Sequence, residues 1–109
     1  MANASGDTGP IRSEFAGDPD MLELVQTFVD ELPVRAAQLT ASLEAGDRDG
    51  LIRLAHQLSG SCGGYGFASI GDHARRLERE LNESDLSGTL AEVREQVDEL
   101  VALCGRVVV

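Results

Sequence analysis

Apolar residues recur at intervals of three and four along most of the chain, which is the spacing of helices that bury one face. The first such stretch starts at Asp18 and Pro19, where Asp can cap a helix and Pro suits its first turn. It predicts a helix to about Gly46 that is kinked at Pro33, or two helices that meet at Pro33. The inward positions expected here are Leu22, Val25, Phe28, Val29, Leu32, Ala36, Leu39 and Leu43.

Three further stretches repeat this pattern. Asp47 or Asp49 caps a second helix that ends at Gly63 and Gly64. A third helix is expected over about 67–82, then a turn at 85–87 and a fourth helix over about 88–106. The inward positions are Leu51, Leu54, Ala55, Leu58 and Cys62, then Ile70, Ala74, Leu77 and Leu81, then Leu90, Val93, Val97, Leu100, Val101 and Cys104. Short connections between amphipathic helices favour an all-α, antiparallel up-down four-helix bundle.

The two ends of the chain lack this periodicity. Residues 1–10 are small and polar with Gly and Pro, so we expect a flexible tail ahead of a domain that spans 11–109. The stretch from Ile11 to Ala16 is expected to form a short helical turn over one end of the bundle. The valines at 107–109 have no evident partner strand, so a helix end or frayed tail is expected there.

Composition narrows the class of protein. The chain has 109 residues, no Trp and four other aromatic residues, which fits one domain with an aliphatic core between helices. A net charge of -10 argues against nucleic acid or an anionic membrane surface as partner. There is no apolar run of about 20 residues and no signal-peptide pattern, so we expect a cytoplasmic location. Both cysteines fall at inward positions, which predicts core residues and no disulfide, and no zinc-type ligand spacing is present.

The second helix carries the most distinctive chemistry. His56 lies on the side opposite its buried stripe, and Gly60 and Gly63 flank His56 on that side. A glycine inside a helix costs about 1 kcal/mol relative to alanine. Two glycines beside an exposed imidazole therefore indicate a face kept clear for the close approach of another surface.

These residues belong to a longer motif. The run Ala55-His56-Gln57-Leu58-Ser59-Gly60-Ser61-Cys62, followed by Gly66, resembles the motif of histidine phosphotransfer (HPt) domains, Ala-His-x-Leu-Lys-Gly-small-small. The resemblance extends over about 19–104. It implies a phosphocarrier of two-component relays, without an ATP site of its own, that moves a phosphoryl group between aspartates of response-regulator receiver domains.

The same resemblance implies the partners and the roles of single residues. The partners would be receiver domains and a sensor or hybrid histidine kinase, with Mg²⁺ supplied by the receiver and this chain acting as a monomer. His56 would be the phosphorylated residue, because a neutral imidazole can attack phosphorus through Nε2 near neutral pH. Glu78, on the next helix, would orient the ring by accepting a hydrogen bond from Nδ1. The alternative is that Glu78 is a surface carboxylate paired with Arg75 or Arg79.

Ser59 departs from the family motif. It stands where the family has a lysine that neutralises the phosphoryl oxygens, and it offers a hydroxyl without a charge. Arg53, one turn before His56, is the first candidate for the missing cation, followed by Arg75 and Arg79 on the next helix.

The cleared face of the second helix is the expected docking surface. A receiver is expected to dock over His56, Gly60 and Gly63, together with Ile52 on the same side of the helix. Tyr65 is expected to pack under the loop after the glycines, with a docking role as the alternative. Two other functions stay open: a phosphotransfer module of a larger hybrid or chemotaxis-type kinase, and a module that binds receivers without carrying phosphate, which the serine at 59 favours.

Overall fold

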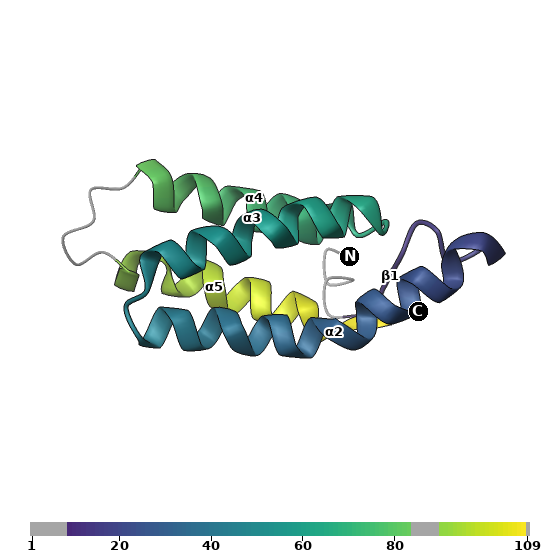
Figure 1. Ribbon diagram of the computed structural model, residues 1–109, viewed down its shortest axis with the longest axis horizontal. Helices are drawn as coiled ribbons and strands as arrows, with labels where there is room; N and C mark the ends of the chain where they lie inside the picture. Colours follow the sequence, from purple (N-terminus) through teal and green to yellow (C-terminus); the bar gives the residue numbers. More distant parts are fainter. Residues whose placement is uncertain (1–8, 84–89, 109) are drawn as a thin grey trace.

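The computed structural model describes residues 9–83 and 90–108, and within them four helices form a bundle. The elements are β1 (Ile11–Arg12), α2 (Pro19–Glu44), α3 (Arg48–Gly64), α4 (Ala68–Glu83), α5 (Leu90–Cys104) and β2 (Val107–Val108). Helix α3 packs on α2 and α4, and α5 closes the ring by packing on the same two helices. Figure 1 shows the chain reversing direction from each helix to the next along the long axis. The predicted all-α four-helix bundle is confirmed.

The helix ends follow from local chemistry. The carboxylate of Asp18 accepts a hydrogen bond from the backbone N–H of Asp20 at 2.9 Å, and Pro19 takes the first helical position. Asp47 caps α3 by accepting from the N–H of Gly50 at 2.9 Å, which decides between the two predicted caps. Helix α2 continues through Pro33 as one element, so the alternative of two helices is wrong. The predicted turn at 85–87 lies outside the described residues.

The core contains the aliphatic side chains that the periodicity placed inward. Val25, Leu51, Ala55, Ile70 and Leu77 are fully buried, as are most other inward positions. Leu22 is an error of that pattern, because its side chain is 39% exposed. Leu22 belongs to the first turns of α2, which project beyond the ends of α3 and α4 in Figure 1.

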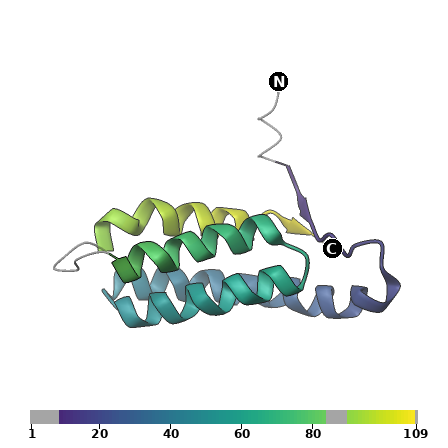
Figure 2. The ribbon, with the colours of Figure 1, turned by 90° about the horizontal axis from the view of Figure 1, so that it is seen from above.

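The chain ends pair with each other as a short parallel ladder, in which Ile11 lies opposite Val107 (Figure 2). The N–H of Ile11 donates to the carbonyl oxygen of Arg106 at 2.8 Å, and the Arg106 guanidinium donates to the carbonyl oxygen of Gly9 at 2.9 Å. The helical turn expected over Ile11 to Ala16 is therefore wrong for Ile11 and Arg12, which form β1, whereas residues 14–17 do form a turn. The helix end or frayed tail expected at the terminal valines is wrong for Val107 and Val108, which form β2. Each segment provides the partner strand that the other lacked. Of the expected N-terminal tail, residues 1–8 lie outside the described part.

The segment after β1 holds the end of α3. The hydroxyl of Ser13 donates to the carbonyl oxygen of Tyr65 at 2.6 Å, and the N–H of Glu14 donates to that of Gly66 at 2.9 Å. Gly66 has φ of +86°, and a Cβ there would lie 2.5 Å from the Ser13 hydroxyl oxygen. Only glycine allows both this backbone conformation and this close approach. The N-terminal segment thus fixes the turn at the end of α3.

Candidate functional site

His56 lies on the outer face of α3 with an open approach. Its side chain is 72% exposed. A Cβ built at Gly60 or at Gly63 would meet no atom within 4 Å, so both glycines leave free space beside the imidazole. The cleared face predicted for α3 is present in the structure.

Glu78 reaches His56 from α4. The distance from His56 Nδ1 to Glu78 Oε2 is 3.0 Å, and the glutamate side chain is only 23% exposed. A carboxylate accepts hydrogen bonds and does not donate them, so Nδ1 carries the proton and Nε2 keeps its lone pair in the neutral ring. Among the described residues, Glu78 forms no ion pair with Arg75 or Arg79, the alternative partners, and the Arg75 guanidinium contacts Asp72 at 3.2 Å instead.

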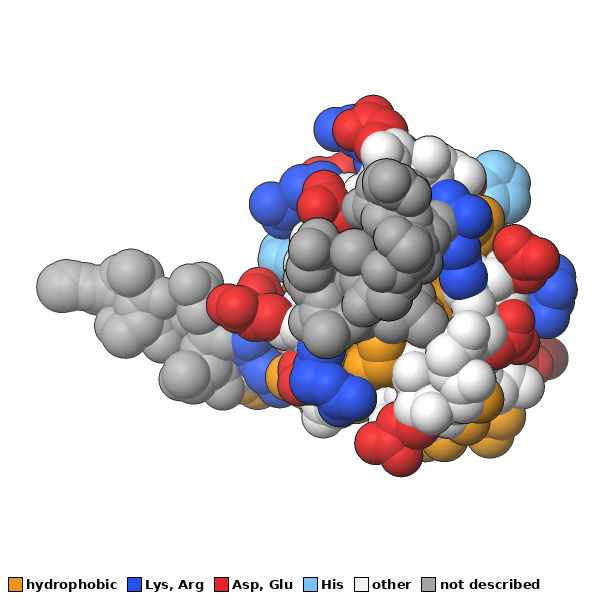
Figure 3. All heavy atoms as spheres, turned by 90° about the vertical axis from the view of Figure 1, so that its left-hand side faces the viewer, with side chains coloured by type: hydrophobic (Ala, Val, Ile, Leu, Met, Phe, Trp, Pro, Cys, Tyr) orange, Lys and Arg blue, Asp and Glu red, His pale blue; other side chains and the backbone are white. Residues whose placement is uncertain are grey.

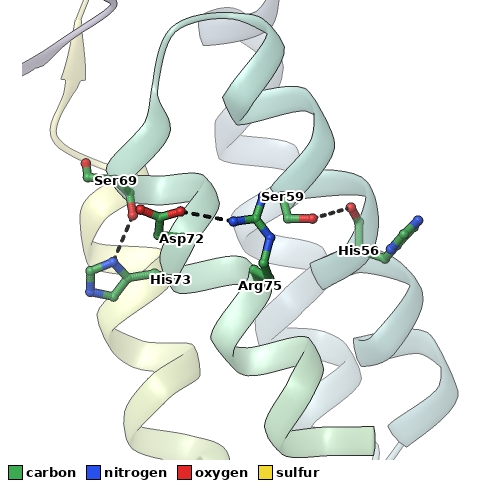
Figure 4. A network of polar contacts seen from close by, with 6 residues as sticks. All are labelled: His56, Ser59, Ser69, Asp72, His73 and Arg75. Atoms are coloured by element: carbon green, nitrogen blue, oxygen red, sulfur yellow. Dashed lines mark hydrogen bonds and ion pairs between the residues drawn. The ribbon is translucent and has the colours of Figure 1, made fainter.

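Ser59 is turned away from the imidazole. Its side chain is buried, and its hydroxyl donates to the backbone carbonyl oxygen of His56 at 2.8 Å (Figure 4). Helix α4 covers this position closely, since a Cβ at Gly71 would lie 3.1 Å from the Ser59 carbonyl oxygen. In this conformation the Ser59 hydroxyl is engaged with the backbone of His56 and not with its imidazole.

The three arginines expected near His56 lie differently from one another. Arg53 is exposed on α3 itself. Arg75 is directed along α4 to Asp72, as Figure 4 shows. Arg79 lines a hollow between α4 and α5 together with His73, and a second hollow on α4 together with Arg75. The two histidine side chains of the chain appear on opposite sides of the molecule in Figure 3.

A hollow between α2 and α3 opens beside His56, and one of its lining residues is Arg35, a positively charged side chain that the sequence did not point to. Its lining residues are Arg35, His56, Gln57, Gly60, Ser61, Gly64 and Tyr65. Arg35 lies on α2, and its place at this hollow depends on how α2 is aligned against α3. The Tyr65 ring stacks on Phe28 with centroids 4.8 Å apart, so it packs under the turn as predicted and also lines the hollow.

The remaining residues with a predicted role or a reactive side chain are Ile52, His73 and the two cysteines. Ile52 is half-buried against the core next to the His56 face. Ring nitrogen Nδ1 of His73 donates to the carbonyl oxygen of Ser69 at 2.9 Å, one turn earlier in α4. Cys62 and Cys104 are buried free thiols. Burial raises the pKa of Cys62 to about 12 and that of Cys104 to about 11, so neither is a thiolate near neutral pH.

The described part of the chain was compared with the requirements of a metal site and of a membrane-spanning helix. There, no three His, Cys, Asp or Glu side chains gather as metal ligands. Over the same residues, no helix has both the length and the apolar character that crossing a membrane requires.

Comparison with known proteins identifies the family. The family described as Hpt domain matches residues 23–106. Among curated proteins, the chain is similar to the signal transduction histidine-protein kinase BarA of Shigella flexneri and of Escherichia coli strain K12. In both cases it is 28% identical over 103 residues, which is 90% of this chain and 11% of the relative. The chain thus spans about a tenth of the length of these relatives. The comparison with solved structures gave no match.

The matched segment contains His56, Glu78 and most of the four-helix bundle described above. Because it covers the greater part of the chain, the protein belongs to the Hpt domain family, whose members are phosphotransfer modules of two-component signalling.

Proposed function

We propose that this domain carries a phosphoryl group on Nε2 of His56 between aspartates of receiver domains. The observation that carries this proposal is the contact of 3.0 Å between His56 Nδ1 and Glu78, on a face that Gly60 and Gly63 leave open. The contact holds the ring in the tautomer whose free nitrogen faces solvent. The open face admits the surface that delivers the phosphoryl group.

The proposed step exchanges one bond for another. The Nε2 lone pair attacks the phosphorus of an aspartyl phosphate, a P–N bond forms, and the aspartyl P–O bond breaks with its electron pair on the departing carboxylate. The ring then carries a positive charge with its proton still on Nδ1, directly opposite the Glu78 carboxylate. Glu78 therefore interacts more strongly with the phosphorylated ring than with the neutral one, which favours the transfer. The reverse step passes the group to the next aspartate.

The receiver supplies the rest of the chemistry in this proposal. Mg²⁺ belongs to the acidic site of the receiver, where it neutralises charge on the moving phosphoryl group. This chain provides the nucleophile, its orientation and a docking face over His56, Gly60, Gly63 and Ile52. It acts as a carrier without an ATP site of its own, and a sensor or hybrid histidine kinase feeds the relay.

Label transfer from a phosphorylated receiver tests the proposal. The parent protein is expected to gain acid-labile, base-stable label, which is the signature of phosphohistidine. His56→Gln is expected to gain none, while the matched control His73→Gln labels like the parent. Label that persists in His56→Gln overturns the assignment of the nucleophile.

A second candidate is that the domain works inside a larger kinase. The curated relatives are histidine kinases in which the similar segment occupies about a tenth of the chain. The complete reading frame of the gene distinguishes this case, in which a receiver on the same polypeptide donates the phosphoryl group. A domain that binds receivers without carrying phosphate would show binding by calorimetry but no label on His56.

A further inference from the structure

The phosphoryl group on His56 brings two negative charges to a site whose own helix lacks the family lysine. Ser59 supplies no charge, and its hydroxyl is engaged with a backbone carbonyl oxygen. The chain has nine arginines and no lysine. The cation near the phosphoryl group must therefore be an arginine that lies within reach of Nε2, or come from the partner.

Most of these arginines are occupied or lie elsewhere. Arg48 donates to the carbonyl oxygen of Leu81 at the far end of α3, at 2.8 Å from Nη2. Arg76 and Arg79 line a hollow between α4 and α5, and Arg94 lines a hollow on α5. The remaining ones near the chain ends or on α4 are Arg12 and Arg106 at the strand ladder and Arg75 at Asp72. Arg35 and Arg53 are left as candidates.

Arg35 has the geometry that the site requires. In the described part of the chain, it is the one arginine that lines the hollow beside His56. Gly60 lines the same hollow, and its missing side chain leaves open space between α2 and the imidazole. Arg53 lies on α3 and is absent from this lining.

The surroundings of Arg35 hold it in place without saturating it. Its side chain is 29% exposed, so most of its length packs against the bundle. Its ion pair with Glu31 is long, at 3.6 Å, and involves a carboxylate that is 55% exposed. Since a guanidinium has five N–H donors, several remain for phosphoryl oxygens.

The positive charge of Arg35 also acts on the buried thiol of Cys62 in α3. Burial is the main reason that the pKa of Cys62 rises to about 12, the negative charge of Cys104 adds to the rise, and Arg35 opposes it. The guanidinium of Arg35 thus lies close enough to α3 for its charge to act on groups of that helix.

We infer that Arg35 is the cation that binds the phosphoryl oxygens of phosphorylated His56 and takes the place of the lysine missing at Ser59. The inference rests on the proposed function. The interaction makes and breaks no covalent bond: two guanidinium N–H groups donate to phosphoryl oxygens while phosphorus stays on Nε2. It stabilises the dianion and slows its hydrolysis.

The test uses a phosphate donor that needs no partner. The full chain is incubated with phosphoramidate, a small molecule that phosphorylates histidine, and the half-life of the label is measured in the parent and in Arg35→Ala. We expect a half-life about fivefold shorter in the variant, which corresponds to about 1 kcal/mol. Arg35→Lys should recover most of the loss, because the charge returns. Arg76→Ala, on the α4–α5 side, is the matched control and should behave like the parent.

A second measurement separates a charge effect from a structural one. Phosphorus NMR follows the second protonation of the phosphoryl group, which should move to higher pH by about 0.7 unit when the nearby cation is removed. A mere loss of packing does not shift this titration. Thermal unfolding of each variant verifies that the bundle is intact.

The outcomes also separate this inference from the proposed function. Equal half-lives and titrations in the parent and Arg35→Ala overturn the inference, as does an effect found in Arg53→Ala alone. If phosphoramidate labels His56 and Arg35→Ala shortens its half-life, but no receiver exchanges phosphate, the inference stands and the proposed function fails. Absence of label on His56 from either donor overturns both.

Discussion

Removal of the Glu78 carboxylate is the most direct perturbation of the site. Glu78→Ala deletes the acceptor that contacts His56 Nδ1 at 3.0 Å and leaves the nucleophile itself in place. The free ring then prefers its other tautomer, in which Nε2 carries the proton and is not nucleophilic. The ring also loses the negative charge that balances the positive charge of the phosphorylated state.

The size of the effect follows from the exposure of the pair. A hydrogen bond to a charged group contributes about 1.5–3 kcal/mol when it is shielded from water. The imidazole is 72% exposed, although Glu78 is only 23% exposed. Solvent screening therefore reduces the contribution to about 1 kcal/mol, or about fivefold in the rate of transfer. Glu78→Gln keeps an acceptor oxygen and loses the charge, so a smaller loss is expected.

Two measurements check this reasoning. The initial rate of label transfer from a phosphorylated receiver is compared among the parent, both Glu78 variants and Glu83→Ala, which removes an exposed carboxylate from the same helix. Nitrogen-15 NMR of the imidazole reports which ring nitrogen carries the proton. A parent that is mainly protonated on Nε2, or a Glu78→Ala variant that transfers at the parental rate, would refute the orienting role.

The remaining predictions concern the glycines and the thiols. Gly60→Gln should slow transfer by about a hundredfold by blocking approach to the imidazole, with thermal stability retained, and normal transfer in a folded variant would contradict the docking face. Gly63→Ala should raise the free energy of unfolding by up to about 1 kcal/mol. Gly71→Ala should lower it by about 1 kcal/mol, because the new Cβ meets a carbonyl oxygen of α3 at 3.1 Å; denaturant titrations giving the same sign for both would refute the packing argument. The free energy of unfolding should also fall above about pH 9, because the unfolded chain releases thiol protons that folded Cys62 and Cys104 keep until about pH 12 and 11; a double alanine variant with an equal fall would exclude this origin.

The features that were predicted correctly from the sequence are mainly those that depend on a single helix. The stripe of Ile70, Ala74 and Leu77 is buried as expected, because helical periodicity alone decides which face an element buries. The same periodicity placed His56 on the outer face of its helix. The contact with Glu78 was also expected, through the resemblance to the family motif.

The sequence did not predict what depends on how helices and strands are set against each other. Arg35 lines the hollow at His56 only because of the register of α2 on α3. Ser59 is buried because α4 approaches closely at Gly71, a distance that no sequence pattern states. The ladder between Ile11 and Val107 joins two-residue strands that are too short to show alternation.

That ladder also has a mechanical consequence. Its strands are parallel and belong to opposite ends of the chain, so tension applied at Gly9 and Val108 slides one strand along the other. The hydrogen bonds of the ladder and the bond from Arg106 to Gly9 then carry the load together rather than one after another. The applied force therefore acts on the ladder before it acts on the helices.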